Sequence, residues 1–510
     1  MNAIAPIKNP DRFFIDGNWV RPSSAATIDV INCATEELFA TVAEAQTDDI
    51  NRAVSAARVA FDRGPWARMT HIERAGYLRA IGVELKMVAD EGARILTSES
   101  GVLHTIAKAR TTALSGIYAS YAGLADTFPF QERHAPLGGG NVGLLVREPV
   151  GVVAAIVPWN FPPILIAHKV APALLAGCTI VLKASPEAPG AAYLLAEACE
   201  KAGLPPGVLN IVTADRQVSE LLVRHAHVDK VTFTGSTAAG RKIASICGER
   251  IARCTLELGG KSAAVILDDC DIGVAAQAIA SRATFLTGQV CSSLTRIVVT
   301  RRRHDEMVEA LSANFEKVKV GDPFDPACEM GPLAMRRQRD RVEGFIEKGK
   351  LEGAKLATGG GRPAHLNRGF FIEPTVFGNV DNNSTLAREE IFGPVLSVIP
   401  VEDEAGAVEV ANDTIYGLNA SVFTNDAERA YAVARELRSG TVGHNAFRTD
   451  FSIAFGGFKQ SGIGREGGRE GLIPFLETKT VILDAMPKSM GRVWTRREVL
   501  DESEASELGL

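Results

Sequence analysis

Apolar positions recur along the chain at two different periods, and the two periods alternate. Segments 48–63, 70–96 and 217–224 carry Ala, Leu, Ile and Val at helical spacing. Between later helical segments lie short continuous apolar runs, at 152–157, 179–183, 209–212, 230–235 and 262–267. Such runs, when helices separate them, are typical of parallel strands that are buried on both faces of a sheet. This part of the chain therefore predicts an α/β domain.

A second alternation of the same kind begins at 296–300 and predicts a second α/β domain. Its further apolar runs lie at 370–377, 395–401 and 417–424. Residues 134–149 (HAPLGGGNVGLLVREP) differ, because a glycine-rich turn leads into an extended run, which favours a projecting hairpin. After Lys479 the apolar pattern fades, and the acidic stretch 501–507 predicts a disordered tail.

Composition and charge narrow the class of protein. A chain of 510 residues exceeds one ordinary core, so two or three domains are expected. With 46% hydrophobic and 23% charged residues, the composition is that of a soluble globular protein. The formal net charge of −6 offers no general attraction to nucleic acid or to an anionic membrane.

The N-terminal sequence and the cysteine pattern predict the cellular compartment of the protein. The start of the chain lacks the features of a secretory signal, and prolines interrupt the uncharged stretch 151–167 before it reaches the length of a bilayer span. The 8 cysteines show no CxxC pair and no metal-ligand spacing with histidine. We expect a cytoplasmic protein with free thiols, no bound metal and no membrane partner.

Two polar residues follow buried strands, where α/β proteins bind their ligands. Glu257 closes an apolar strand before Gly259 and Gly260, so partial burial would raise its pKa toward that of a general base. A solvated, unimportant strand end is the alternative. Asn160, in PWNFP (158–162), could donate its amide to an oxyanion, or it could cap the next helix as an Asx turn.

Two further stretches favour contacts with a nucleotide. In FTGSTAAGRKIA (233–244) a strand, a Gly-Ser-Thr turn and a helix offer free N–H groups to an anion, although the motif is neither GxGxxG nor a P-loop. Lys183, in VLKASPEAP (181–189), could bind a ribose hydroxyl or a phosphate. Glu187 could accept from ribose hydroxyls or simply cap the following helix. Each signal is weak alone.

The order and spacing of these segments are specific. PWNFP, LKAS, LPPGVLNIV, FTGST, LELGGK, GQVCSS, EEIFGPV and FGGFKQSGIGRE occur in this order. Together they closely resemble the aldehyde dehydrogenase superfamily over roughly residues 10–482. The resemblance implies a variant Rossmann cofactor lobe, a second α/β catalytic lobe and a small β oligomerisation arm, usually in a homodimer or homotetramer.

The resemblance also implies domain limits. Residues 1–128 and 150–258 would form the cofactor-binding domain, and 259–460 the catalytic domain. Residues 129–149 and 461–490 would form the oligomerisation arm and the C-terminal strand, followed by the tail 491–510.

The resemblance assigns roles to residues in the same way. Cys291, in FLTGQVCSS (285–293), would attack the aldehyde as a thiolate, while Asn160 and the Cys291 N–H hold the oxyanion. Hydride transfer to nicotinamide would leave a thioester, which Glu257 hydrolyses by activating water. The implied cofactor contacts are Ile156, Pro158, Trp159, Lys183, Ser185, Glu187, Gly235, Ser236, Leu258, Glu390 and Phe392. The implied substrate-pocket residues are Leu165, His168, Val290, Ser292, Phe447, Phe451 and Phe455.

The sequence departs from the family pattern at four positions. Leu286 stands where many members have Asn, His168 where many have Trp, and Ala454 where a Pro is common. Pro186 takes the place of the acidic ribose ligand of many NAD-preferring members, with Glu187 one residue later. No Arg lies within five residues of Lys183 to bind a 2′-phosphate, so we expect NAD to be preferred and NADP to be used measurably.

The implied pocket predicts a hydrophobic substrate. Apart from His168 and Ser292 it is apolar, and it holds no Arg or Lys for a carboxylate, with Arg448 on the same loop as the exception. An aromatic, terpenoid or long aliphatic aldehyde is favoured over a semialdehyde acid. The alternatives are a CoA-acylating enzyme, which typically lacks the carboxylate at Glu257, a semialdehyde dehydrogenase, a Cys–His hydrolase and a non-catalytic binding or structural protein.

Overall fold

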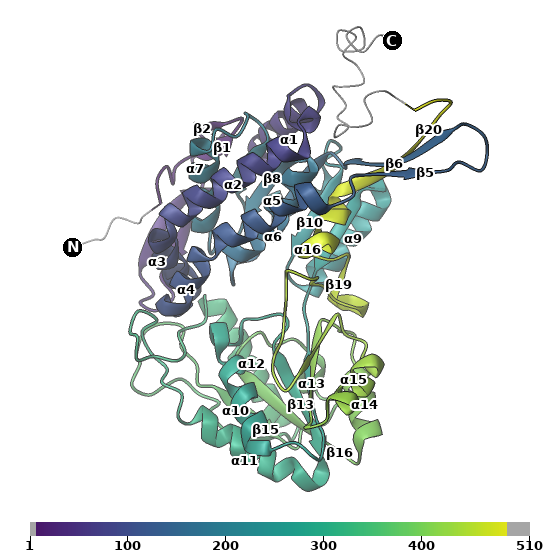
Figure 1. Cartoon of the computed structure of the whole chain (residues 1–510). Coiled ribbons are helices and arrows are strands. Elements are labelled where there is room, and N and C mark those ends of the chain that lie inside the picture. The colour runs from purple at the N-terminus through teal and green to yellow at the C-terminus, as the bar shows by residue number, and fades with distance from the viewer. Residues whose placement is uncertain (1–6, 487–510) are drawn as a thin grey trace.

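The computed structural model describes residues 7–486, which form an upper lobe, a lower lobe beneath it and a projecting β arm (Figure 1). The upper lobe contains a sheet in the order β19-β11-β10-β7-β8-β9-β1-β2. Its central strands are parallel, and β1, β2 and β19 pair antiparallel at the two edges. The strands are β1 (Phe13–Ile15), β2 (Asn18–Val20), β7 (Val152–Ile156), β8 (Thr179–Ala184), β9 (Leu209–Thr213), β10 (Lys230–Thr234), β11 (Arg253–Glu257) and β19 (Gly462–Ile463).

Helices cover both faces of this upper sheet, which explains its continuous apolar strands. Val153 and Ala155 pack against helices on one face, and Val152 and Ala154 pack against helices on the other. The first face carries α2 (His71–Met87), α5 (Leu114–Thr127), α6 (Pro162–Ala176) and α7 (Gly190–Lys201). The second carries α1 (Thr47–Asp62), α8 (Arg216–Arg224) and α9 (Thr237–Arg250). α3 (Ala89–Ser100) and α4 (His104–Thr112) lie toward the lower lobe (Figure 1).

The lower lobe repeats this layered arrangement around a sheet in the order β14-β15-β16-β13-β12-β17-β18. Its strands are β12 (Ser262–Ile266), β13 (Leu294–Thr300), β14 (Lys355–Thr358), β15 (Thr375–Gly378), β16 (Val395–Val401), β17 (Asn419–Phe423) and β18 (Thr441–His444). Its helices are α10 (Ile272–Ala283), α11 (His304–Phe315), α12 (Arg336–Leu351), α13 (Thr385–Arg388), α14 (Glu404–Asn412) and α15 (Ala427–Glu436). The mixed α/β fold with parallel sheets that the sequence predicts is confirmed.

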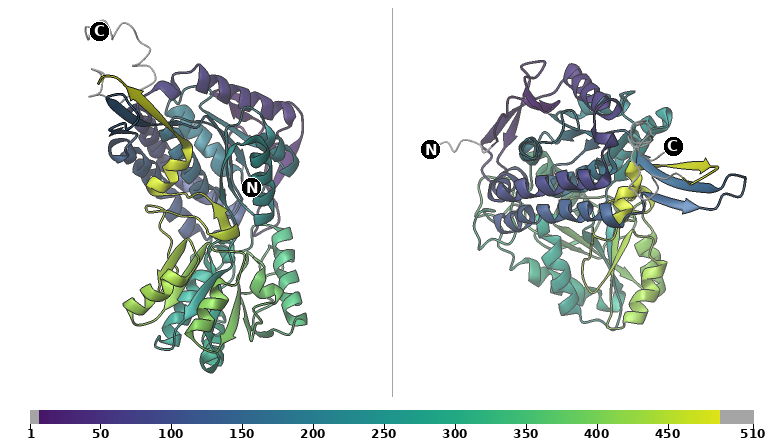
Figure 2. Two further views of the ribbon diagram at one scale, coloured as in Figure 1. Left: turned by 90° about the vertical axis from the view of Figure 1, so that its right-hand side faces the viewer. Right: turned by 45° about the horizontal axis from the view of Figure 1, so that its top comes forward.

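The arm is a three-stranded antiparallel sheet that projects from the upper lobe, as the views in Figure 2 show. Its strands, in spatial order, are β20 (Leu476–Leu483), β6 (Val142–Pro149) and β5 (Gln131–His134). Val142, Leu144 and Val146 are buried against β20. A separate ribbon, β3 (Thr27–Ile31) with β4 (Leu38–Ala43), borders the upper lobe.

Several expected boundaries differ from those of the structure. The helix predicted over 70–96 is two helices that meet at Val88, whose ψ of 16° interrupts the helical path. The strand predicted at 370–377 starts only at Thr375, after Pro374, which has no N–H to give to a sheet. Within 461–490, β19 joins the upper sheet and α16 (Gly468–Leu472) precedes β20, so only Leu476–Leu483 pairs with the arm.

The C-terminal tail and membrane-spanning helices were also subjects of sequence-based expectations. The predicted disordered tail, 491–510, lies outside the described residues. Among residues 7–486, no helix has the length and apolar character needed to span a membrane.

Candidate active site

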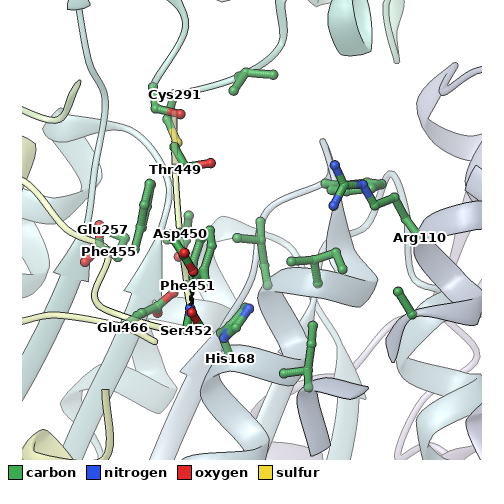
Figure 3. A pocket seen from close by; sticks show the side chains of 18 of the residues that line it. Arg110, His168, Glu257, Cys291, Thr449, Asp450, Phe451, Ser452, Phe455 and Glu466 are labelled. Atoms are coloured by element: carbon green, nitrogen blue, oxygen red, sulfur yellow. Dashed lines mark hydrogen bonds between the residues drawn. The ribbon is translucent and has the colours of Figure 1, made fainter. Parts of the chain in front are cut away.

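The site lies where the chain crosses from the upper sheet to the lower one. β11 ends at Glu257, and β12 begins five residues later at Ser262. Beside this crossing is a cavity of about 610 Å³ that is lined by both lobes (Figure 3). Cys291, Glu257 and Asn160 all line this cavity, although they are far apart in the sequence. The structure therefore brings together the three predicted catalytic residues.

The backbone before Cys291 is held in an unusual conformation. Leu286 and Thr287 have φ angles of 50° and 55°, in the left-handed region that bulky and β-branched residues rarely adopt. The Thr287 hydroxyl donates to the Gly331 carbonyl at 3.0 Å, which anchors this turn. Gly288 has a φ of 71°, and a Cβ there would overlap the backbone of Gly393. The position of Cys291 thus depends on a strained turn with no room for a side chain at Gly288.

Asn160 is tied to the same turn. Its side-chain amide donates to the Gln289 carbonyl at 2.9 Å. The Gln289 side chain is itself fixed, since it donates to the Leu286 carbonyl and accepts from the Ala334 N–H. The N-cap of α6 is Phe161 without any side-chain hydrogen bond, so the Asx-turn alternative for Asn160 is wrong. An amide has two N–H donors, and one of those of Asn160 is left for a ligand in the cavity.

Glu257 is a buried carboxylate without a hydrogen-bond partner among the described residues. Its exposed fraction is 2%, and neither carboxylate oxygen finds a donor. Burial raises its pKa well above the ordinary value, the nearby Glu466 carboxylate raises it further, and Lys169 opposes both. A raised pKa is what general-base duty near neutral pH requires, so the alternative of a solvated strand end is wrong.

Next to Glu257 lies an ion pair between Lys169 on α6 and Glu466. The two side chains are 0% and 3% exposed, and the ammonium donates to one Glu466 oxygen. The other Glu466 oxygen has no partner in the described structure. The neighbouring Gly467 N–H donates to the Tyr121 hydroxyl at 3.2 Å. The pair places a negative and a positive charge beside Glu257, and the two act in opposite directions on its pKa.

The surroundings of the Cys291 thiol favour its protonated form, because they raise its pKa. Burial raises its pKa, and the carboxylates of Glu390 and Glu257 raise it further. Gly260 allows the backbone to approach, because a Cβ there would overlap the Cys291 carbonyl. Formation of the thiolate therefore needs a base or a positive charge in the cavity.

The predicted cofactor residues gather at the carboxyl ends of adjacent strands in the upper sheet. Ile156, Pro158 and Trp159 follow or end β7, Lys183 and Ser185 lie at the end of β8, Gly235 and Ser236 follow β10, and Leu258 follows β11. Ser236 caps α9, with its hydroxyl accepting from the Ala239 N–H at 3.3 Å. This is where open α/β sheets bind dinucleotides, with the diphosphate at a helix N-terminus.

Donors and acceptors at these strand ends, and on the lower-lobe segment before β16 that carries Glu390 and Phe392, fit a dinucleotide. Burial lowers the pKa of Lys183 to about 8. A Cβ on Gly235 would overlap the Phe233 ring, so a larger residue in this turn would have to push that ring aside. Glu390 accepts from the Gly260 N–H at 3.1 Å, and burial raises its pKa to about 7. Phe392 packs edge-to-face on Trp159, with ring centroids 5.4 Å apart.

Glu187 has a partner that the sequence did not reveal. It accepts from the Ser185 hydroxyl and forms an ion pair with Arg337, at the start of α12 in the lower lobe. Burial raises the pKa of Glu187, but these two donors outweigh burial and hold it below the usual value. The alternative that Glu187 caps the following helix is wrong, because α7 begins without a side-chain cap. No Arg lies within five residues of Lys183 in the sequence, but the fold brings Arg337 to Glu187.

The predicted substrate residues all line the cavity. They are Leu165, His168, Val290, Ser292, Phe447, Phe451 and Phe455. His168 stacks on Phe451 at 4.2 Å between ring centroids, and Phe451 stacks on Phe455 at 4.4 Å. Burial lowers the pKa of His168 to about 3, so this ring is neutral and continues the aromatic wall. Figure 3 shows His168 below Phe451 in the same cavity.

Sequence reasoning missed several residues of the cavity wall. Among them are Phe161, Ile164, Tyr121, Glu466 and two arginines, Arg110 and Arg282. The expectation that Arg448 is the one cation beside the pocket is therefore wrong. Lys169 did carry a signal, because it is the one Lys, Arg, Asp or Glu in the apolar helix α6, and a buried charge needs a partner. In residues 7–486 no cluster of His, Cys, Asp and Glu is suited to a metal.

Comparison with known proteins identifies the class. The model of the aldehyde dehydrogenase family matches residues 19–481. The chain is 43% identical over 471 residues to geranial dehydrogenase of Castellaniella defragrans, covering 92% of this chain and 98% of the relative. It is 42% identical over 475 residues to 3-succinoylsemialdehyde-pyridine dehydrogenase of a Pseudomonas species, with 92% and 98% covered.

Solved structures agree with the sequence relatives. A Mycobacterium tuberculosis aldehyde dehydrogenase in complex with NAD+ has a TM-score of 0.90 and 44% identity, covering 94% of this chain and 98% of the other. A cysteine-to-alanine mutant of aldehyde dehydrogenase C from Pseudomonas syringae, with NAD+ and octanal, has a TM-score of 0.91 and 38% identity, covering 96% and 100%.

Fold, site and similarities together define an oxidoreductase that acts on aldehydes and converts them to carboxylic acids. The chain belongs to the aldehyde dehydrogenase family.

Proposed function

We propose that Cys291, Asn160 and Glu257 carry out a hydrolytic aldehyde oxidation. The observation that carries this proposal is their position on one cavity, with Glu257 buried and unpartnered among the described residues. Once the Cys291 thiol has passed its proton to solvent in the cavity, the thiolate adds to the aldehyde carbon, and the resulting oxyanion accepts hydrogen bonds from the free Asn160 N–H and the Cys291 backbone N–H. NAD, held by the residues at the ends of the upper-sheet strands, would supply a hydride acceptor at this point, so that the adduct on Cys291 would become a thioester.

Glu257 then serves as the base for hydrolysis. It takes a proton from water, the hydroxide adds to the thioester carbonyl carbon, and the carbon–sulfur bond then breaks, which releases the acid and leaves Cys291 as a thiolate. The Glu466–Lys169 pair lies behind Glu257 and accepts the proton in turn. A CoA-acylating enzyme would not need this base. The buried carboxylate therefore supports hydrolysis.

For the cofactor we propose NAD as the preferred acceptor, with NADP used measurably. Lys183 and Glu187 would bind the adenine ribose, the turn at Gly235 and Ser236 the diphosphate, and Glu390 the nicotinamide ribose. The NAD+ complexes of similar proteins support this assignment. Arg337 gives NADP a possible counter-charge, but it is paired with Glu187, whose own charge would repel a 2′-phosphate.

The substrate that we propose has an apolar body, either aromatic, terpenoid or long aliphatic. The aromatic wall of His168, Phe451 and Phe455 supports this class, and so do the names of two similar proteins. One of these is a geranial dehydrogenase, and the other was solved with octanal. A short semialdehyde acid would place its carboxylate near Glu257 and Glu466, where like charges repel.

We also propose how the domains divide the work and how copies of the chain assemble. Residues 1–128 with 150–258 would bind the cofactor, 259–460 would carry Cys291, and β5, β6 and β20 would join copies of the chain into a dimer or tetramer. The exposed Leu137 at the arm tip and Ile482 on β20 support such contacts. The 8 cysteines are free thiols, which supports a reducing compartment such as the cytoplasm.

A burst experiment tests the catalytic proposal. Cys291→Ala is expected to lose aldehyde oxidation and keep cofactor binding, while Cys328→Ala in the lower lobe keeps full activity and serves as the matched control. Glu257→Gln is expected to give one rapid turnover of reduced cofactor and then a steady state slower by roughly 10²-fold. Substantial turnover by pure Cys291→Ala protein would contradict the assignment. Loss of the burst in Glu257→Gln would move Glu257 to activation of the thiol.

A further inference from the structure

Three arginines from separate segments line the substrate cavity at its exposed end. They are Arg110 on α4, Arg282 on α10 and Arg448 on the loop after β18, and all three are exposed. None of the three guanidinium groups forms an ion pair or a side-chain hydrogen bond within residues 7–486. Arg282 lies over the ring of Phe285, 5.5 Å from its centroid. Figure 3 shows Arg110 across the cavity from Cys291 and Glu257, with its guanidinium directed inward.

Positive side chains lie mainly at the exposed end of the cavity, and negative side chains lie at its buried end. The exposed end has the three arginines and one carboxylate, Asp450, which accepts from the Ser452 hydroxyl and N–H. The middle is the apolar and aromatic wall. The buried end holds the two carboxylates Glu257 and Glu466, and the cations that act on Glu257 there are Lys169, in the pair described above, and Arg465.

From this distribution of charge we infer that the enzyme takes aldehydes with an apolar body and an anionic group at the end remote from the carbonyl. The inference rests on the proposed function of the same cavity and names its substrate class. An anion at the exposed end meets guanidinium groups, which bind carboxylates and phosphates with paired N–H donors. An anion at the buried end meets Glu257 and Glu466. The carbonyl end of the substrate is therefore directed to Cys291.

Length is a necessary part of this substrate class. The cavity volume of about 610 Å³ is that of a site for a molecule well above the size of a short semialdehyde. In a short oxo acid the carboxylate would not reach the arginines and would stay in the buried part of the cavity, near Glu257 and Glu466 and the aromatic side chains, where burial of a charge is costly. In a long one the chain fills the apolar section and the anion reaches the arginines.

The test compares matched substrates that differ only in the terminal anion. The long pair is octanal and the ω-oxo carboxylate of the same length, and the short pair is butanal and succinic semialdehyde. An ω-oxo alkyl phosphate of the longer length shows whether phosphate can take the place of carboxylate. The readout is the ratio of kcat/KM for the anionic member to that for the neutral member. We expect a ratio above about 5 for the long pair, mainly through KM, and below one for the short pair.

Variants then assign the effect to the arginines. Arg110→Gln, Arg282→Gln and Arg448→Gln are each expected to lower the long-pair ratio by about 3- to 5-fold, and the triple variant brings it near one. Arg435→Gln, an exposed arginine on α15 outside the cavity, is the matched control and leaves the ratio unchanged. High salt is expected to lower the wild-type ratio, because exposed charges are screened.

The outcomes separate this inference from the proposed function. A long-pair ratio at or below one, with octanal still oxidised, overturns the inference and leaves the proposed function standing. A high ratio that the triple variant retains also overturns it, because the anion is then bound elsewhere. If no member of either pair is oxidised while the cofactor binds, the proposed substrate class itself is wrong and the inference falls with it.

Discussion

Glu466→Gln separates two consequences of the charged group behind Glu257. The substitution keeps the size of the side chain and removes its negative charge. Lys169 then remains fully buried without its ion-pair partner. Breaking a buried ion pair in this way costs about 3–5 kcal/mol, so the free energy of unfolding is expected to fall by that amount. The double variant Lys169→Met/Glu466→Gln removes both charges and is expected to recover most of the loss.

The same substitution is expected to lower the pKa of Glu257. The Glu466 carboxylate adds to the effect of burial in raising this pKa, whereas Lys169 lowers it. Once Glu466 is neutral, its repulsion of the Glu257 carboxylate is gone and the attraction by Lys169 remains, so the ionised form of Glu257 is favoured. Because the ionised form is the base, the acid limb of the deacylation rate against pH moves to lower pH. The variant is thus less stable and yet faster at the acid end of the profile.

Stopped-flow measurement with a good aldehyde distinguishes the two steps. The burst phase reports attack by Cys291, and the steady state after a full burst reports thioester hydrolysis. Glu470→Gln, an exposed residue on α16, is the matched control and should change neither stability nor profile. If the acid limb of hydrolysis stays in place or moves to higher pH while stability falls, Glu466 has a structural role alone and the proton exchange with Glu257 is refuted.

Three further predictions concern single side chains. Burial raises the pKa of Glu257 above 4.5, and an acid with a raised pKa destabilises the fold as pH rises toward that pKa. Glu257→Gln should therefore raise Tm at neutral pH and lose this gain at acid pH. An equal change of Tm at both pH values in calorimetry would be inconsistent with a buried charge. Gly288→Ala should lower kcat by roughly 10²-fold through displacement of the Cys291 turn, whereas Gly353→Ala, with a φ of 86° but open space around it, should leave kcat unchanged. Glu187→Gln should raise KM for NAD about 10-fold and raise kcat/KM with NADP relative to that with NAD, and Arg337→Gln should lower kcat/KM with NADP alone. If the wild type prefers NADP and Glu187→Gln brings no gain with NADP, the cofactor proposal is reversed.

The sequence predicted the sheets well because their strands are buried on both faces. In Val152–Ile156 every side chain packs on one helical layer or the other, so the run is apolar throughout and easy to recognise. Boundaries were less predictable where apolar residues are buried without regular structure, as at Phe370 and Phe371. The break at Val88 was also hidden, because the apolar spacing continues across it.

The candidate site was predictable where it depends on motifs and hidden where it depends on contacts between lobes. Cys291, Glu257 and Asn160 lie in recognisable segments, and the cavity unites them. Arg337 reaches Glu187 across 150 positions of sequence, and nothing local in either segment indicates it. Arg110 has the spacing of an ordinary solvated helix face, and only the fold turns that face toward the cavity.

The pairing of β19 with β11 has a consequence for synthesis of the chain on the ribosome. β11, which ends in Glu257, is an edge strand until Gly462–Ile463 emerge and pair with it. At about 5–20 residues per second, that takes roughly 10–40 s, during which the nascent upper lobe exposes unpaired N–H and C=O groups. β6 waits for β20 in the same way. A message cut short before these last strands would therefore yield an aggregation-prone fragment, rather than a half-enzyme able to bind cofactor.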